Sequence, residues 1–251
     1  MRIAVRRLIP TTLWLAVSLL LPGVLSAATD DALAALLRGQ PDAAFTLLAG
    51  RSDAPSLALL ARVYVGQAAF ASTPERKRQL YARSEAAART ALAADPQWAS
   101  AHVELANALA LQLPGAGLLR ATQVGPEIRR LFERATALDP GQARAWMGLG
   151  TWHAQALGMG GLVALASGAS ETAMRAAHQR AITLEPNEVF FRLSYADSLL
   201  LLAGSQPRRA DALRREARTV LEAALTLTPQ TYWQRDDQNT VRERLRALAG
   251  R

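Results

Sequence analysis

The sequence contains no cysteine among its 251 residues. This absence excludes a disulfide framework, a thiolate nucleophile and a lipid anchor on an N-terminal cysteine. Only three residues are histidine, so a zinc or copper site would need carboxylate ligands as well. Aromatic residues make up 6% of the chain, and nearly all the basic residues are arginine. The sequence therefore offers few residues for a thiol-based or metal-based centre.

Alanine, leucine and arginine dominate what is present. Their side chains lose little rotamer freedom in a helix, so the composition favours helices over sheets. Hydrophobic residues make up 50% of the chain, which is enough for the core of one domain or of a short solenoid. We therefore expect an all-α fold.

The first 28 residues have the features of a secretory signal peptide. Three arginines precede an apolar run at 11–21, and small residues follow it. We expect cleavage after Ala27 or Ala28 and a periplasmic protein. The alternative is an uncleaved anchor in the inner membrane, although the apolar run is short for a membrane-spanning helix.

The formal net charge of the whole chain is +8, but three of its arginines lie in this predicted signal. The remainder has 26 basic and 21 acidic residues, which is a net charge of +5. So modest an excess, in a protein expected outside the cytoplasm, does not indicate a nucleic-acid partner.

A repeat runs through the rest of the chain. Similar strings, such as TALDP and ITLEP, end at Pro96, Pro140, Pro186 and Pro229, with spacings of 44, 46 and 43 residues. Proline has no amide proton to continue a helix, so each string predicts the end of one helix. Self-similarity of this kind is typical of a solenoid, in which a helical hairpin buries its apolar face only against its neighbours.

Positions within the repeat indicate how these hairpins pack. The residue five positions before each proline is alanine, which lets two helix backbones approach closely. These alanines are Ala91, Ala135, Ala181 and Ala224, and the residues three positions before them are Ala88, Phe132, His178 and Leu221. In the first helix of one unit, Trp146, Leu149 and Gly150 resemble the pattern of the tetratricopeptide repeat (TPR). The resemblance implies a right-handed superhelical solenoid.

The units are about ten residues longer than the usual tetratricopeptide repeat. The extra residues lie between the two helices of a unit and include LPGAGLLRATQVGP and GMGGLVALASGAS. We expect lengthened loops along one edge of the stack. Their apolar side chains are Leu118, Leu119, Leu162, Val163 and Leu165. Burial of these side chains is slightly favoured over partner docking or self-association.

The chain therefore divides into the signal, a short helical hairpin at 29–54, the repeat array at 55–229 and a tail at 230–251. We expect the tail to form a capping helix that contains a capping box at Thr240 and Glu243. Val241, Leu245 and Leu248 would face inward.

From about Ser84 to the C-terminus, the order of segments is similar to that of the regulator of microtubule dynamics proteins and their bacterial relatives. The matching parts are the segment 132–139, the string AWMGLGTWH, an apolar insert, a further helix and a charged terminal helix. Exported helical repeat accessories of substrate-binding-protein transporters are similar too, which implies docking to a partner in the periplasm. Neither resemblance implies catalytic residues or a cofactor.

In the tetratricopeptide family the first helices line the inner wall of the superhelix. By register, that wall here comprises Ser100, Val103, Asn107, Arg144, Met147, Thr151, Gln155, Phe190, Leu193 and Asp197. Its four apolar members suit a peptide with apolar anchors, in an extended or helical conformation. The alternative is that the tail or the first hairpin covers part of this wall.

His153 and His178 fall in the two helices of one unit and suggest a metal hypothesis. Two more ligands would have to come from His102 or from a carboxylate such as Glu171. The interpretation that we favour is that both histidines are packed or hydrogen-bonded interior residues.

The function that the sequence favours is a non-catalytic periplasmic scaffold that binds another protein or peptide, with no cofactor. Homo-oligomerisation is compatible with it, and membrane contact is expected only through an uncleaved signal segment. The alternative is a small-ligand or metal-handling accessory of an envelope transport system. An enzyme ranks third because no nucleophile, cofactor fingerprint or metal set is evident.

Overall fold

The computed structural model describes residues 27–250, apart from the side chain of Leu118. The predicted signal peptide therefore lies almost wholly outside the described residues. This part of the chain folds into twelve α-helices and one short 3-10 helix, with no strand. The helices are α1 (Ala27–Leu37), α2 (Pro41–Leu47), α3 (Ala54–Ala69), α4 (Pro74–Ala94), α5 (Ala99–Leu111), α6 (Gly117–Leu138), α7 (Ala143–Gly158), α8 (Gly161–Ser167), α9 (Glu171–Leu184), α10 (Val189–Ser205), η1 (Pro207–Arg209), α11 (Ala210–Leu225) and α12 (Tyr232–Ala249).

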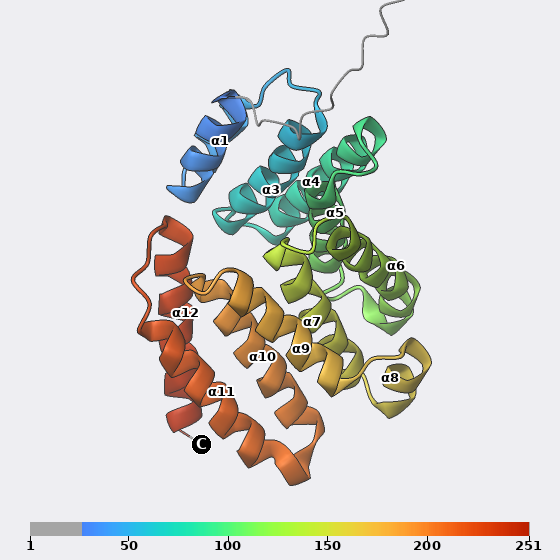
Figure 1. Cartoon of the computed structure of the whole chain (residues 1–251), viewed down its shortest axis with the longest axis vertical. Helices are drawn as coiled ribbons and strands as arrows, with labels where there is room; N and C mark the ends of the chain where they lie inside the picture. The colour runs from blue at the N-terminus through green and yellow to red at the C-terminus, as the bar shows by residue number, and fades with distance from the viewer. Residues whose placement is uncertain (1–26, 251) are drawn as a thin grey trace, which may run out of the picture.

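The helices pack as hairpins stacked one after another (Figure 1). The paired helices are α3 with α4, α5 with α6, α7 with α9, and α10 with α11. Each first helix also contacts the first helix of the next unit, from α3 through α5, α7 and α10 to α12. The predicted all-α superhelical solenoid is confirmed.

The repeat prolines end the second helices as predicted. The helices α4, α6 and α9 stop two residues before Pro96, Pro140 and Pro186, because the chain before a proline leaves the helical conformation. The alanine five positions before each proline is fully buried, with 0% exposure in all four units. A larger side chain there would force the two helices apart.

Bulky residues of the second helices fit over glycines of α7. A Cβ atom at Gly148 would lie 2.3 Å from the ring of Phe132, which belongs to α6. One at Gly150 would lie 2.6 Å from Cδ2 of His178, which belongs to α9. Both glycines are therefore required by close packing rather than by backbone conformation.

The inserts differ from the predicted loops. In the second unit the insert extends α6, which continues through Pro126, and in the third unit it forms the short helix α8. The favoured burial of the insert leucines was wrong, since Leu119, Leu162 and Leu165 are 73%, 85% and 81% exposed. Ala164 is the one buried residue of α8, so its two leucines lie on faces that the described helices do not cover, and Leu119 is exposed in the first turn of α6.

The terminal helix begins earlier than its predicted capping box. The Thr231 side chain caps α12 by accepting a hydrogen bond from the Gln234 amide at 3.1 Å. Thr240 lies inside the helix, where its hydroxyl donates to the Asp236 carbonyl at 3.4 Å, so the box prediction was wrong. The inward face is confirmed, because Val241 is fully buried and the leucines at 245 and 248 pack against the same core.

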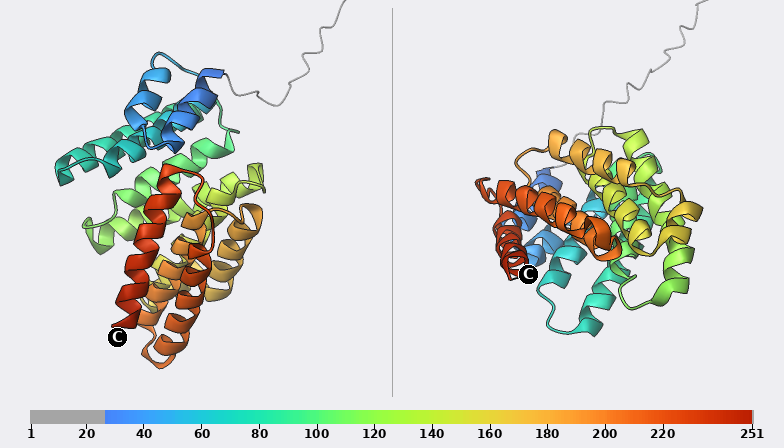
Figure 2. Two further views of the ribbon diagram at one scale, coloured as in Figure 1. Left: turned by 90° about the vertical axis from the view of Figure 1, so that its left-hand side faces the viewer. Right: turned by 90° about the horizontal axis from the view of Figure 1, so that it is seen from below.

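The N-terminal end of α12 returns to the first hairpin (Figures 1 and 2). The Trp233 indole donates to the Leu36 carbonyl at 2.6 Å, across 197 residues of sequence. The Phe70 ring lies 5.8 Å from the rings of both Tyr232 and Trp233. Gly39 makes room for this contact, since a Cβ there would lie 2.5 Å from Tyr232 Cγ. The two ends of the superhelix are therefore joined.

Substituting Trp233 tests how much this junction contributes to stability. We expect Trp233→Ala to lower the free energy of unfolding by about 2 kcal/mol, since a half-buried ring and a hydrogen bond are lost. Trp233→Phe keeps an aromatic ring and should cost about half as much. Urea unfolding measures both, and hydrogen exchange should accelerate in α1 and α2 of the alanine variant. Unchanged exchange there would show that the junction does not hold the first hairpin.

Candidate partner-binding surface

The predicted wall residues lie along the line where successive first helices touch. Several of their polar members form links between units. These links are Gln142 Nε2 to Ser100 Oγ (2.9 Å), Thr151 Oγ1 with Ser194 Oγ (3.0 Å) and Arg244 Nε to Asp197 Oδ1 (2.8 Å). The linked residues are 42 to 47 positions apart, which is one repeat unit. Many wall residues thus hold the superhelix together rather than facing an open space.

Three of the four predicted apolar anchors are not available to a partner. Val103, Met147 and Leu193 are only 1%, 7% and 4% exposed. Met147 packs with Phe191 of the next first helix, and Leu193 belongs to the core cluster that includes Val241 of α12. The alternative, in which the tail covers part of the wall, is the one that the structure supports, because α12 contacts α10 and Arg244 bonds Asp197. The anchor role of these three residues was wrong, because adjacent first helices lie in direct contact.

An ion pair joins α5 to α7 on this wall. Arg144 donates from both terminal nitrogens to the carboxylate of Glu104, and the Nη2 to Oε2 distance is 3.2 Å. The Glu104 side chain retains 4% exposure and that of Arg144 25%. Burial alone would lower the pKa of Arg144, but the adjacent Glu104 carboxylate raises it overall. Among the described residues, Arg144 is therefore the one direct partner of the buried Glu104 carboxylate.

Three predicted wall residues keep accessible side chains without a structural role. Phe190 is 42% exposed, Gln155 is exposed and Asn107 is partly exposed. Neither amide side chain has a hydrogen-bond partner within residues 27–250. These three positions are free to contact another molecule, and their role in binding stays a prediction.

Arg62 of α3 also belongs to this wall, although it was missed. It has the same place in its unit as Asn107 and Thr151 in theirs, so the repeat register extended by one unit would have found it. Its guanidinium has no hydrogen bond or ion pair with any residue that the structure describes. The nearby charge of Arg144, followed by burial, lowers its pKa to about 10. Arg62 is therefore a wall cation without a direct partner, although Glu104, Glu185 and Glu188 lie close enough to act on its charge and raise its pKa.

Carboxylates also gather on this wall, where Glu185 and Glu188 act on the charges of Arg62 and Arg144. Gln234 of α12 donates to Glu188 Oε2 at 3.0 Å, at the start of α10. Burial, with Glu188 and Asp236 nearby, raises the pKa of Asp237 to about 7. Burial and Glu188 likewise raise the pKa of Glu185. None of these contacts was evident from the sequence, because they join α12 to a helix of a different unit.

The raised pKa of Asp237 predicts a pH-dependent stability. In the unfolded chain this carboxyl titrates near its ordinary pKa of 3.8, so between about pH 4 and pH 7 only the folded protein keeps the proton. Stability is therefore lost as the pH rises through this window. We expect Asp237→Asn to raise the free energy of unfolding by about 2 kcal/mol at pH 8 and to change it little at pH 4. Urea unfolding of both proteins at the two pH values is the measurement, and an equal gain at both would contradict this account.

The two histidines of the metal hypothesis have interior surroundings. His178 is fully buried, stacks on Tyr195 with ring centres 5.1 Å apart, and its Nε2 lies 2.9 Å from Ser198 Oγ. Burial lowers its pKa to about 3, so it is neutral. His153 Nδ1 accepts a hydrogen bond from the Ser170 amide at 3.4 Å. Residues 27–250 contain no group of three potential metal-binding side chains.

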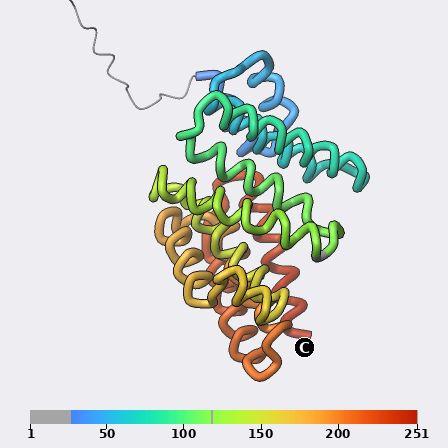
Figure 3. Tube along the Cα trace, turned by 90° about the vertical axis from the view of Figure 1, so that its right-hand side faces the viewer, coloured from blue at the N-terminus to red at the C-terminus, as the bar shows by residue number. Residues whose placement is uncertain are grey.

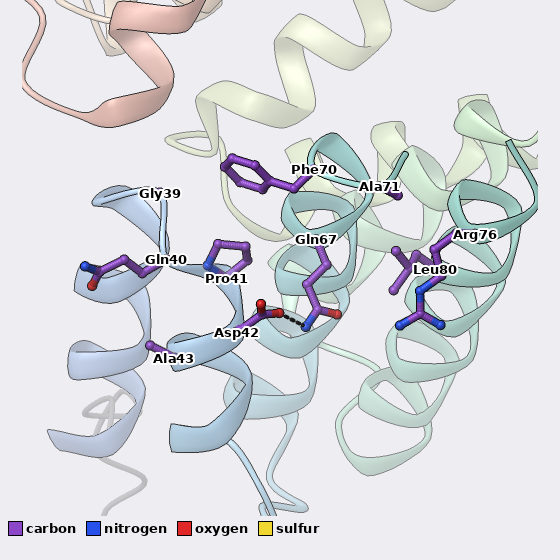
Figure 4. A pocket seen from close by; sticks show the side chains of 10 residues that line it. All are labelled: Gly39, Gln40, Pro41, Asp42, Ala43, Gln67, Phe70, Ala71, Arg76 and Leu80. Atoms are coloured by element: carbon purple, nitrogen blue, oxygen red, sulfur yellow. Dashed lines mark hydrogen bonds between the residues drawn. The ribbon is translucent and has the colours of Figure 1, made fainter. Parts of the chain in front are cut away.

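A separate open cleft of about 510 Å³ lies between the first hairpin and the α3–α4 turn (Figure 4). Buried Leu80 lies at its base, and Phe70 stands at its rim. Asp42 Oδ1 accepts a hydrogen bond from Gln67 Nε2 at 2.7 Å on one side, and Arg76 stands across from them. Because Phe70 also contacts α12, this cleft lies beside the junction of the two ends and not on the inner wall.

Comparison with known families identifies the chain. Residues 36–248 match the sequence model of RMD1-3, regulator of microtubule dynamics protein 1-3. The protein belongs to the RMD1-3 family. The resemblance seen in the segment order from Ser84 onward is confirmed, and it extends to the first hairpin. No curated protein sequence matches the chain.

One solved structure supports the fold of this family member, and a second shows a weaker likeness. TTC0263, a thermophilic TPR protein of Thermus thermophilus, matches with 19% identity and a TM-score of 0.59, over 85% of this chain and 96% of that one. PilF of Pseudomonas aeruginosa has 19% identity and a TM-score of 0.47, over 88% of this chain and 90% of that one. The likeness to TTC0263 shows that the hairpins form a TPR solenoid.

Proposed function

We propose that this RMD1-3 family protein is an exported, non-catalytic scaffold that holds a segment of another protein against its inner wall. The observation that carries the proposal is Arg62, a wall cation with no ion-pair or hydrogen-bond partner within residues 27–250. The name of the family refers to microtubule dynamics. An exported protein would meet other partners, so protein binding is the property that we carry over.

The accessible side chains define the kind of segment that fits. Arg62 suits a carboxylate, because guanidinium groups bind carboxylates through paired hydrogen bonds. Phe190, at 42% exposure, offers a surface for one apolar side chain. Asn107 and Gln155 offer amide groups for the backbone of an extended segment. We therefore favour an extended segment with one carboxylate, placed at Arg62, and one apolar residue over the fully apolar peptide expected from sequence.

Site-specific crosslinking tests this proposal. A photo-reactive amino acid at Phe190 or Gln155 should trap one and the same partner in cells. Placed at Arg215, which is exposed on the outer helix α11, it should not. Arg62→Gln should weaken capture from Phe190, while the folded protein stays intact because Arg62 has no bond to lose. Equal capture from Arg215, or no effect of Arg62→Gln, would count against the inner wall.

Export is a separate part of the proposal and rests on the N-terminal sequence alone. Osmotic-shock fractionation and mass spectrometry of the purified chain measure it. A periplasmic protein that begins at Ala28 or Thr29 is expected. A chain that keeps Met1 and sediments with membranes would support the alternative of an N-terminal anchor.

A further inference from the structure

The most exposed apolar side chains of the molecule lie together at one edge. Leu162, Leu165 and Leu119 have the highest exposures among the large hydrophobic side chains that the structure describes. The first two belong to α8 and the third to the first turn of α6, and the two helix ends lie side by side (Figures 1 and 3). Arg129 Nη1 of α6 donates to the Ser167 carbonyl at 2.6 Å, which fixes α8 beside α6. We call this surface the insert edge.

The segments that carry these leucines are uncharged. Residues 105–119 and 154–170 contain no acidic, basic or histidine side chain. Glycines at 160 and 168 have φ of 111° and 67°, so the chain turns sharply at both ends of α8 and pushes it outward. Such a protruding apolar tip is costly in water unless something covers it.

The charges that border the insert edge are basic. Arg120 and Arg130 of α6 are exposed and have no ion-pair partner in the described part of the chain. Neighbouring carboxylates are already paired, Glu133 with Arg129 at 2.6 Å and Glu171 with Arg209 at 2.7 Å. The last of these pairs joins the 207–209 turn to the start of α9. The edge therefore combines protruding leucines with unpaired arginines.

We propose that the insert edge docks on a bilayer that contains anionic phospholipid. Leucines of a short protruding helix can enter the boundary between headgroups and acyl chains, while arginines beside them contact phosphates. A second copy of the chain would need a large complementary surface, whereas the tip is narrow and is bordered by like charges that repel each other. No helix within residues 27–250 is long and apolar enough to cross a membrane, so contact through this edge would be peripheral.

Vesicle flotation of the full chain tests the proposal. The protein should float with phosphatidylcholine vesicles that contain phosphatidylglycerol, less with phosphatidylcholine alone, and less at high salt. Leu162→Glu combined with Leu165→Glu should weaken this partitioning at least about tenfold. Both side chains are more than four-fifths exposed, so the variant should fold normally, which circular dichroism checks. Leu47→Glu, on α2 and 41% exposed, is the matched control and should float as wild type does.

The same variants distinguish docking on a bilayer from membrane binding through the signal segment and from self-association. Because wild type and variants carry the same N-terminal segment, an uncleaved signal would make all of them float equally, and that result would overturn the proposal. The proposal would also be overturned if the wild-type protein failed to float with anionic vesicles. If gel filtration shows a wild-type dimer that the double variant converts to a monomer, with flotation unchanged, the edge joins two copies of the chain instead.

Discussion

Gly148→Ala should destabilise the protein by about 3 kcal/mol, because the new methyl group overlaps a buried aromatic ring. A Cβ at this position would lie 2.3 Å from two carbons of Phe132, which is 3% exposed and closes the contact between α6 and α7. The ring has no free space to enter, since it packs within a core cluster whose buried residues come from six helices. Helix propensity by itself would make the alanine variant more stable than the wild type. A lower free energy of unfolding would therefore come from the packing clash.

A double variant distinguishes this clash from general sensitivity of the core. Phe132→Leu alone should cost about 1 to 2 kcal/mol. Combined with Gly148→Ala it should be more stable than Gly148→Ala alone, although each change destabilises by itself. Gly204→Ala in α10 is the control, since nothing lies within 4 Å of the new carbon, and it should stabilise by about 0.5 kcal/mol or more. Urea unfolding of the four proteins is sufficient, and additive losses would refute the proposed contact.

The second large effect is expected at the ion pair between α5 and α7. Arg144→Gln removes the direct partner of Glu104, whose side chain is 4% exposed. Leaving one charge buried without its partner typically costs about 3 to 5 kcal/mol, and we expect a loss of this size at pH 7. The remaining cation, Arg62, forms no ion pair with Glu104 and would not replace Arg144 without moving.

Substituting Glu104 as well removes the unpaired charge. Glu104→Gln together with Arg144→Gln should recover most of the loss, because two amides can hydrogen-bond where two charges were paired. Arg78→Gln is the matched control on an ion pair whose partners are 68% and 66% exposed, and it should leave the urea midpoint unchanged. A double variant as unstable as Arg144→Gln would mean that the arginine stem, and not the charge, holds the two helices.

Local patterns predicted the repeat architecture well. Prolines at constant spacing end helices whatever surrounds them, because the missing amide proton and the ring act within one turn. The buried alanines and the bulky residues three positions before them follow from the same register. The same register would also have predicted that Arg62 lies on the wall, since Arg62 has the same repeat position as Asn107.

Other predictions depended on what each residue meets in space. Thr231 and Thr240 both precede residues suited to a helix start, and only the path of the chain after Pro229 decides that Thr231 is the cap. The insert leucines follow the same helical spacing as core residues, but α8 has no helix on its outer side. Likewise Val103 and Met147 occupy wall positions of the family but are buried by the next first helix.

The sequence by itself determined that this chain forms stacked helical hairpins, that a proline follows the end of each second helix and which small residues permit close contact. These are interactions within a turn or with the adjacent unit. Only the tertiary structure decided that the ends meet through Trp233, that Arg62 faces the wall unpaired and that the insert leucines point outward. The curvature accumulated over several units brings Trp233 to Leu36 across 197 positions, and no local pattern encodes that pairing. The other two outcomes depend on which neighbouring helices each side chain meets.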